Sequence, residues 1–296
     1  LERLRESITA RCPGPFAIWV EKILLGDEPL RPNWPVEGST GYDALARLTR
    51  LFLDPTARPL LDRIYHDQVP SADPPEVVVE TSKREVVEEY FPADIDRWVR
   101  AARRDPPTGS PPPPDGRLHA ELPELAVDFD VYRSYVEPTG PIDPVDRAIW
   151  RRAFDRATHR GKDTETLRRW WTAWDEGASE SRGPLLRFQQ LTGPVMAKGV
   201  EDRALYRDLR LAALNEVGIP PGWGSDDAVA AFHRDATARA RHWPMSMVTT
   251  STHDTKRSED VRARLLALAQ EPTVWTQLAR LWQEAIRRVP GVPGPP

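Results

Sequence analysis

Apolar and polar residues follow one another along the chain in two kinds of pattern, one with the period of a helix and one typical of strands. The opening L-E-R-L-R-E-S-I places its leucines and isoleucine on one helical face. F-A-I-W-V at 16–20 is a continuous apolar run of the kind found in parallel sheets. V-D-F-D-V at 127–131 alternates with the period of a strand, and P-M-S-M-V-T-T at 244–250 is a third candidate strand. Helical periodicity predicts further helices over 44–68, 83–104, 143–177, 202–215, 258–269 and 274–288.

Strands that alternate with helices are typical of an α/β protein with parallel strands, and this is the fold class that we predict. The stretch D-P-P-T-G-S-P-P-P-P-D-G at 105–116 is too rich in proline to form a core, so it predicts a linker or a surface excursion. Residues 185–202 are harder to assign, because Gly193 and Pro194 interrupt the pattern.

Composition narrows the class of protein. With 296 residues, 40% of them hydrophobic and 29% charged, the chain has the make-up of a globular protein with one large domain or two ordinary ones. The net charge of −4 argues against a nucleic-acid binder, and no apolar run reaches the length of a membrane span. The single cysteine, Cys12, excludes an internal disulfide framework and fits a reducing compartment, so we expect a cytoplasmic protein.

Two residue types have unusual counts. The chain has 11 tryptophans, whose flat rings could stack on sugars, although most tryptophans pack in cores. It has only five lysines, and two of them, Lys198 and Lys256, lie in the most motif-like segments of the chain.

Candidate chemistry follows two of the predicted strands. Glu21 comes directly after F-A-I-W-V, and His253-Asp254 comes shortly after P-M-S-M-V-T-T. In a parallel α/β barrel such positions line the active site. Partial desolvation at a strand end would raise the pKa of a carboxyl group and make it a candidate general acid. The alternative for Glu21 is an ion pair with Lys22 or another neighbour. An imidazole beside a carboxylate can bind the hydroxyls of a sugar.

Six segments, taken in order, resemble one family. They are I-W-V-E-K-I-L-L-G-D-E-P-L, W-P-V-E-G-S-T-G-Y-D, V-Y-R-S-Y-V, F-Q-Q-L-T-G-P-V-M-A-K-G-V-E-D, L-N-E-V-G and S-T-H-D-T-K-R-S-E-D-V-R-A-R-L. The family is maltooligosyl trehalose synthase, within the α-amylase superfamily of glycoside hydrolases. Ser39 stands where the family usually has threonine, and Arg203-Ala204-Leu205 where it tends to have T-A-F.

The resemblance implies an intramolecular transglycosylation that converts the reducing-end α-1,4 linkage of a maltooligosaccharide into an α,α-1,1 linkage. The superfamily uses a retaining mechanism, with two carboxyl groups about 5–5.5 Å apart and a covalent glycosyl intermediate. By resemblance Glu21 is the general acid/base, Asp254 is the carboxylate that favours the distorted sugar ring, and His253 binds the same sugar. Lys198 and Glu201 match positions that hold the reducing-end glucose. The resemblance implies a further substrate contact for Tyr42. For Lys256, Arg257, Glu259 and Asp260 it implies substrate contacts or ordering of the site's rim. Ser258 is also a plausible N-cap of the helix that follows.

The superfamily's nucleophile is an aspartate in a motif resembling G-x-R-x-D-H, and nothing in these 296 residues matches it. Asp43, Asp130 and Asp202 are the nearest candidates, but they follow Glu21 in chain order, whereas the family places the nucleophile upstream. The chain also opens without methionine and ends in V-P-G-V-P-G-P-P. We therefore expect an internal piece of the enzyme, inactive alone, whose partner is the missing N-terminal half of the barrel.

By resemblance, the fold is expected to be a partial (β/α)8 barrel, about strands five to seven, with a large and mainly helical insertion. The expected divisions are a barrel segment with the acid/base strand at 1–43, a helical insertion at 44–125, and a barrel segment with helical excursions at 126–296. The substrate would be a maltooligosaccharide, and neither nucleic acid nor membrane is expected as a partner.

Two other functions stay open at this point. One is a maltooligosaccharide hydrolase of the same superfamily, and the other is a non-catalytic carbohydrate-binding fragment. The basic extension after His253-Asp254 argues against the hydrolase, while the missing nucleophile favours the fragment. No metal is expected, because no His, Cys and Asp cluster shows ligand spacing. No organic cofactor is expected either, and no Gly-rich loop could hold a phosphate.

Overall fold

A computed structural model describes residues 1–12, 14–114, 116–177, 181–222 and 227–289. The described chain is mostly helical and divides into two compact units. The first unit contains Leu1–Pro75 and Asp208–Pro296, and the second contains Glu76–Arg207. We describe each unit by itself. The expected division into barrel segments and an insertion, at 43 and 125, stays a prediction.

The first unit carries two very short strands and a set of helices. The strands β1 (Trp19–Val20) and β2 (Gly38–Ser39) pair in parallel, with Trp19 opposite Gly38 and Val20 opposite Ser39. The helical elements are α1 (Glu2–Arg11), α2 (Tyr42–Leu51), η1 (Pro55–Ala57), α3 (Arg58–Gln68), η3 (Ala212–Leu214), α11 (Ala228–His242), α12 (Glu259–Gln270) and α13 (Pro272–Arg287). Apolar residues of α2, α3, η3 and α12 form one core cluster, which includes Leu45, Leu61, Leu214 and Leu266.

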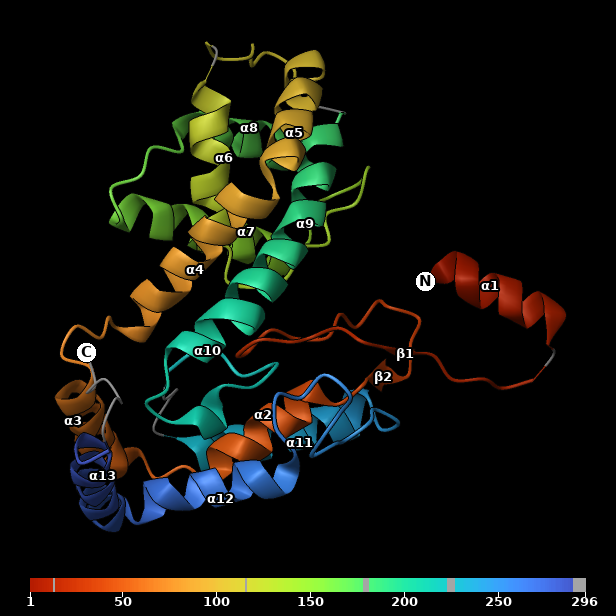
Figure 1. Cartoon of the computed structure of the whole chain (residues 1–296). Helices are drawn as coiled ribbons and strands as arrows, with labels where there is room; N and C mark the ends of the chain where they lie inside the picture. Colours follow the sequence, from red (N-terminus) through yellow and green to blue (C-terminus); the bar gives the residue numbers. More distant parts are fainter. Residues whose placement is uncertain (13, 115, 178–180, 223–226, 290–296) are drawn as a thin grey trace. The chain divides into compact units, whose positions relative to one another are not determined.

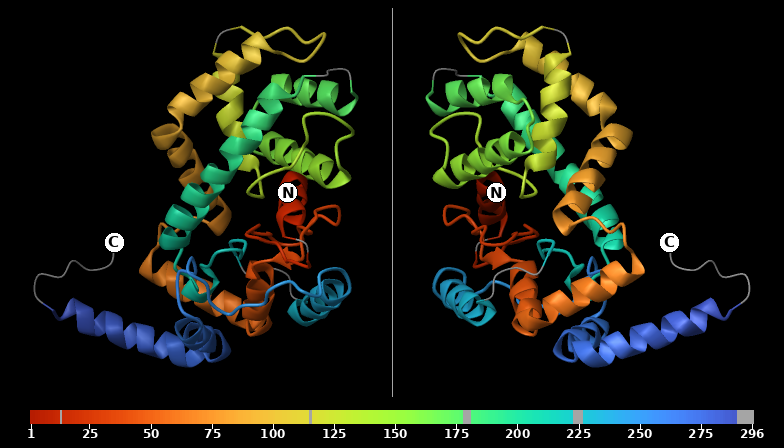
Figure 2. Two further views of the ribbon diagram at one scale, coloured as in Figure 1. Left: turned by 90° about the vertical axis from the view of Figure 1, so that its right-hand side faces the viewer. Right: turned by 90° about the vertical axis from the view of Figure 1, so that its left-hand side faces the viewer.

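The second unit is a helical bundle. Its elements are α4 (Pro75–Tyr90), which starts at the boundary, α5 (Pro92–Arg104), α6 (Arg117–Asp128), α7 (Pro144–His159), α8 (Glu165–Asp175), α9 (Gly183–Met196), η2 (Ala197–Ala204) and α10 (Leu205–Arg207). The helices α5, α6, α8 and α9 lie side by side in Figure 1 and in both views of Figure 2.

Tryptophans fill the core of the second unit. The rings of Trp150 and Trp171 stack with their centroids 4.6 Å apart and their planes 9° from parallel. Trp98, Trp170 and Trp174 are buried in the same cluster. These five tryptophans therefore pack in the core rather than offering a platform for sugars, which confirms the packing alternative for them.

Two of the three predicted strands are wrong. Val127 lies in the last turn of α6, and Phe129 and Val131 follow it in a loop. All three side chains pack into the core of the helical unit, so their alternation reflects burial and not a sheet. Residues 244–250 form no strand either, although Met247 N donates a hydrogen bond to Ser39 O at 3.1 Å. Of the predicted strand at 16–20, only the last two residues pair.

Most of the predicted helices exist, but several have other boundaries. The expected helix at 44–68 divides at Asp54, which accepts a hydrogen bond from Thr56 N and begins η1. The one at 143–177 divides near Gly161, whose φ of 70° ends the helical conformation. No single helix fills 202–215, where the end of η2, α10 and η3 are present, and α11 was not predicted.

Three sequence predictions concern helix ends and loops. Residues 185–202, which the sequence pattern left unassigned, are helical. Pro194 lies inside α9, and η2 follows α9 directly. Ser258 is the N-cap of α12, as expected, although its side chain makes no capping hydrogen bond. The proline-rich stretch 105–116 joins α5 to α6 outside both helices, and its residue 115 lies outside the described residues, as do 290–296 of the loop-like end. Among the described residues, no helix has the length and apolar character needed to cross a membrane.

Candidate active site

The structure brings Glu21, His253 and Asp254 together in the first unit. Glu21 directly follows β1, and the other two lie in the loop before α12. His253 Nε2 lies 3.8 Å from Glu21 Oε1 and 3.6 Å from Asp254 Oδ2. Two segments at opposite ends of the sequence, each singled out because it follows an apolar run, thus meet at one place.

This group of three is open to solvent. The side chain of Glu21 is 48% exposed, and those of His253 and Asp254 are exposed further. The partial desolvation expected for Glu21 is therefore not provided by the described residues. β1 has only two residues, and Trp19 at its start is itself exposed.

Lys22 pairs with Glu28, at 2.7 Å between Nζ and Oε1, and this contact gives no support to an ion pair between Lys22 and Glu21. Both side chains are nearly buried. Burial lowers the pKa of Lys22 and raises that of Glu28, while the attraction between them opposes both shifts. Glu21 is thus left to the cluster with His253.

Tyr42 forms hydrogen bonds both to Glu21 and to the loop that carries His253 and Asp254. It is the first residue of α2 and is only 1% exposed. Its hydroxyl donates to Glu21 Oε1 at 3.2 Å and accepts from Thr252 Oγ1 at 3.0 Å. Burial is the main cause of the raised pKa of Tyr42, to which the charges of Glu21 and Asp254 add. This burial favours a positioning role for Tyr42 over the predicted contact with substrate.

Gly41 allows this close packing before α2. Its φ is 93°, and a Cβ atom there would lie 2.9 Å from Met247 O. The segment that leads to His253 can therefore lie directly against the start of α2.

Side-chain hydroxyls hold the loop that carries His253 and Asp254. Thr252 N donates to Thr255 Oγ1 at 3.2 Å, and the same Oγ1 donates to Thr252 O at 2.8 Å. Asp254 N donates to Thr252 Oγ1 at 3.2 Å. These bonds make a compact turn whose polar groups are satisfied within the loop.

The remaining rim residues have structural partners. The backbone amides of Lys256 and Arg257 donate to the buried Glu216 carboxylate at 2.7 and 3.2 Å. Glu259 Oε2 accepts from Thr250 Oγ1 at 2.6 Å. Glu259 and the exposed Asp260 occupy the first turn of α12, where negative charge is favourable. These contacts support the rim-ordering alternative; they do not test contact with a sugar.

Lys198 and Glu201 lie in the second unit, on η2. This element is a π-helix, a widened turn that is frequent at functional sites. Lys198 is exposed and pairs with Asp202 at 2.7 Å, and this hydrogen bond raises the pKa of Lys198. Glu201 accepts a hydrogen bond from the Tyr132 hydroxyl.

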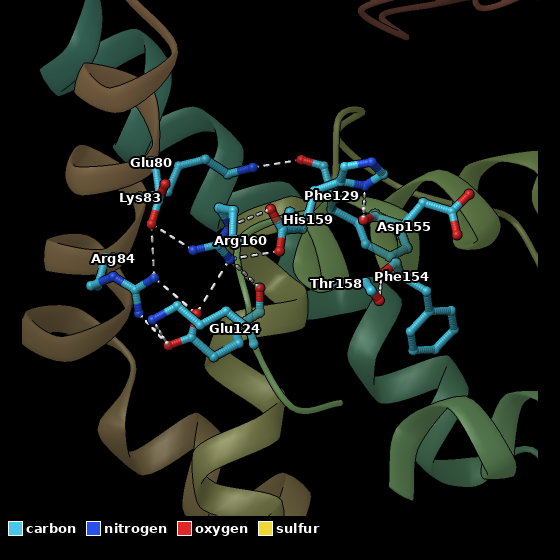
Figure 3. A network of polar contacts seen from close by, with 12 residues as sticks. Glu80, Lys83, Arg84, Glu124, Phe129, Phe154, Asp155, Thr158, His159 and Arg160 are labelled. Carbon is cyan, nitrogen blue, oxygen red and sulfur yellow. Dashed lines mark hydrogen bonds and ion pairs between the residues drawn. The ribbon is translucent and has the colours of Figure 1, made fainter. Parts of the chain in front are cut away.

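Lys83 of α4 packs against η2. A Cβ atom on Gly199 would lie 2.8 Å from Lys83 Cα, so the two backbones are in close contact. Lys83 Nζ donates to Phe129 O at 2.5 Å, and the side chain is buried. Figure 3 shows this bond beside an ion-pair network in which Arg160 reaches Glu80 and Glu124. The network joins α4 and α6 to the end of α7.

We predict that Lys83 makes the stability of the second unit depend on pH. Burial lowers the pKa of Lys83 from 10.5 to about 7 in the folded state. Between these values the unfolded chain binds more protons, so the free energy of unfolding rises with pH from about 7 to 10. The contribution is at most ~1.4 kcal/mol per pH unit. Urea unfolding of Lys83→Met at pH 7, 8 and 9 should show a smaller rise than the unsubstituted chain, and an equal rise would contradict the prediction.

The three aspartates considered as nucleophiles are all paired. Asp43 accepts from Ser39 Oγ at 2.7 Å and from Arg239 at 3.3 Å. Asp130 pairs with Arg152 at 2.7 Å, and Asp202 pairs with Lys198. None of these contacts involves Glu21, so they favour structural roles.

Glu21, His253 and Asp254 could each offer one ligand atom to a metal ion, and these atoms lie within 4.8 Å of one another. Sequence spacing could not reveal this set, since its members come from distant segments. All three are exposed, and exposed acidic groups of this kind are common without an ion. The set therefore does not by itself indicate a metal site.

A further prediction concerns the hydrogen bond between Tyr42 and Glu21. In a double-mutant cycle with Tyr42→Phe and Glu21→Ala, we expect a coupling free energy of ~1 kcal/mol, as for a single hydrogen bond at a partly exposed site. The four free energies of unfolding come from urea titrations of the chain. Additive effects would show that the two side chains do not interact in solution.

The comparisons with known proteins point to one class of protein, the maltooligosyl or glycosyl trehalose synthases. In particular, the chain is 36% identical over 286 residues to putative maltooligosyl trehalose synthases of two Mycobacterium tuberculosis strains. This match covers 94% of the chain but only 34% of each relative. The chain thus spans about a third of the length of the curated relatives it matches. No family model matches the chain.

Solved structures agree with the sequence matches. The maltooligosyltrehalose synthase of Arthrobacter ramosus is 36% identical, with a TM-score of 0.73 over 93% of this chain and 34% of its own. A hypothetical maltooligosyl trehalose synthase of Sulfolobus tokodaii is 28% identical, with a TM-score of 0.70 over 97% of this chain and 34% of its own. These matches confirm the resemblance to maltooligosyl trehalose synthase that the six sequence segments indicate.

Proposed function

We propose that this chain supplies part of a maltooligosyl trehalose synthase, an isomerase that moves a reducing-end linkage from α-1,4 to α,α-1,1. The observation that carries the proposal is the meeting of Glu21, His253 and Asp254 in the first unit. The similarity over nearly the whole chain to proteins of that name supports it. The same similarity supports the finer proposal of a partial barrel, about strands five to seven, and the lone Cys12 supports a cytoplasmic location.

The proposed roles follow from the positions of acids and donors. Glu21 protonates the departing glycosidic oxygen and later takes the proton of the attacking glucose hydroxyl. Asp254, with His253 beside it, binds hydroxyls of the sugar whose ring distorts in the transition state. The exposed face of the cluster leaves room for a sugar to approach all three side chains.

Lys198 and Glu201 are proposed to retain the released glucose. The released glucose must turn over and attack again through its anomeric hydroxyl. Residues that bind it keep it in the site for this second step. Lys198 offers an exposed ammonium group, and Glu201 offers acceptor oxygens on the same π-helix. Tyr42, Lys256, Arg257, Glu259 and Asp260 are proposed to order the rim of the site.

The covalent step needs a nucleophile that these 296 residues do not show in motif form. We propose that the rest of the barrel provides it, so that the partner of this chain is the complementary two-thirds of the enzyme. Exposed apolar side chains on the first unit support an interface. They include Met245, Met247 and Val248 in the loop beside β2, and Leu281 and Trp282 on α13.

Product analysis tests the proposed reaction. We would build a chimera in which residues 1–296 replace the matching third of the Arthrobacter ramosus synthase, and incubate it with maltopentaose. A non-reducing isomer of the same mass is the expected product. Release of glucose with loss of mass would instead indicate a hydrolase, and binding without turnover would indicate a carbohydrate-binding role.

A further inference from the structure

Glu216 is a buried acid that the sequence analysis did not assign. It follows η3 in the first unit and is 1% exposed. A buried carboxylate persists only where its charge is well compensated. Its oxygens accept hydrogen bonds from Val217 N at 2.9 Å, Lys256 N at 2.7 Å and Arg257 N at 3.2 Å, and from an Arg262 guanidinium nitrogen at 3.2 Å.

Arg262 of α12, which bonds to Glu216, also bonds to the backbone on both sides of the His253-Asp254 pair. It is itself buried, and it donates to Arg257 O at 3.0 Å and to Thr250 O. Thr250 precedes the His253-Asp254 pair and Arg257 follows it. Arg262 thus holds both ends of the loop, and the exposed side chains of His253 and Asp254 lie between these ends.

The segment that contains Glu216 also contacts Tyr42, the hydrogen-bond partner of Glu21. Gly218, two residues after Glu216, has a φ of 82°, and a Cβ atom there would lie 3.3 Å from Tyr42 Cβ. Tyr42 in turn donates its hydroxyl hydrogen bond to Glu21. Residues 216–218 therefore lie against both halves of the site: the loop of Asp254 through Glu216, and Glu21 through Tyr42.

We infer that Glu216 is a positioning residue, which sets the His253-Asp254 loop at the distance from Glu21 that the reaction needs. This inference rests on the proposed function. Each amide bonds to a different carboxylate oxygen, so replacing one oxygen with an NH2 group, as in Glu216→Gln, removes the acceptor of Lys256 N or of Arg257 N. The loop can then move relative to Glu21. A misplacement of about 1 Å in a catalytic group can lower a rate about 100-fold.

The test compares Glu216→Gln with Glu121→Gln. Glu121 of α6 is 2% exposed and accepts from Arg117 Nε at 2.7 Å and from the backbone amides of Thr166 and Leu167. It is therefore a chemically matched buried carboxylate, but it lies in the second unit. Both substitutions should lower the stability of the protein, and only the first should disturb the loop.

Two readouts are needed. In the chain itself, hydrogen exchange at the amide of Lys256 or of Arg257 should become about tenfold faster in Glu216→Gln and stay unchanged in Glu121→Gln, as expected when a hydrogen bond of ordinary strength is lost. In the chimera with maltopentaose, Glu216→Gln should lower kcat about 100-fold with little change in KM, and Glu121→Gln should leave kcat near that of the unsubstituted chimera.

The outcomes separate the inference from the proposed function. Unchanged exchange at Lys256 and Arg257 in Glu216→Gln would overturn the inference whatever the activity. An equal loss of kcat in both variants would overturn it too, because stability alone would then account for the effect. If the unsubstituted chimera forms no isomer, the proposed function fails, and the exchange data still decide whether Glu216 holds the loop.

Discussion

The 296-residue chain alone is expected to leave maltopentaose unchanged. A retaining transglycosylation passes through a covalent glycosyl intermediate, which requires a nucleophile as well as an acid/base. Glu21 and Asp254 are proposed for two of the three carboxylate roles, and no motif in the sequence matches the third. Asp43, Asp130 and Asp202 are each held in ion pairs. The measurement is chromatography of maltopentaose after long incubation with the purified chain at high concentration.

The chimera with the Arthrobacter ramosus synthase is the positive control, since it adds the part of that synthase that this chain does not span. Separate expression and mixing of the two parts would test whether they associate without a covalent link. Formation of the non-reducing isomer by the purified chain alone would show that a nucleophile is present within these 296 residues.

The residues of the candidate site could be predicted one by one, because each lies in a recognisable sequence segment. Glu21 and His253-Asp254 each follow an apolar segment, and both lie in segments that resemble one family. Their meeting, with His253 Nε2 3.8 Å from Glu21, is a tertiary contact that no spacing along the chain reveals. Glu216 and Arg262 were missed for the same reason. A buried acid and a buried arginine look like surface residues in a sequence until their partners are known.

The fold shows where local pattern misleads. Val127, Phe129 and Val131 alternate with polar residues, yet they end a helix and enter a loop. Their alternation arises because all three are buried in a helical unit. Long periodic segments such as α12 were recognised well, since an apolar face that repeats over several turns is compatible with a helix and with little else. Short apolar runs have no such redundancy, and two of the three predicted strands were wrong.

Replacement of Glu21 by Gln in the chimera is expected to lower kcat by a factor on the order of 10²–10⁴, the usual contribution of a general acid/base. The amide keeps the size of the side chain and can still accept from Tyr42, but it cannot give a proton to the leaving oxygen. Glu37→Gln is a matched control in the same unit, because Glu37 accepts from Ile18 N and pairs with Arg5. It should change kcat less than tenfold, since the same substitution there removes no proton donor from the site.

A substrate with a better leaving group separates acid catalysis from simple misplacement of the loop. A maltooligosyl fluoride needs little protonation as its bond to the anomeric carbon breaks, so Glu21→Gln should slow its consumption far less than it slows turnover of maltopentaose. Asp254→Asn should slow both substrates alike, because its proposed role is in the ring distortion that both require. If Glu21→Gln slows both substrates to the same extent, then Glu21 does not act as the acid, and its hydrogen bond with Tyr42 would leave it a structural role.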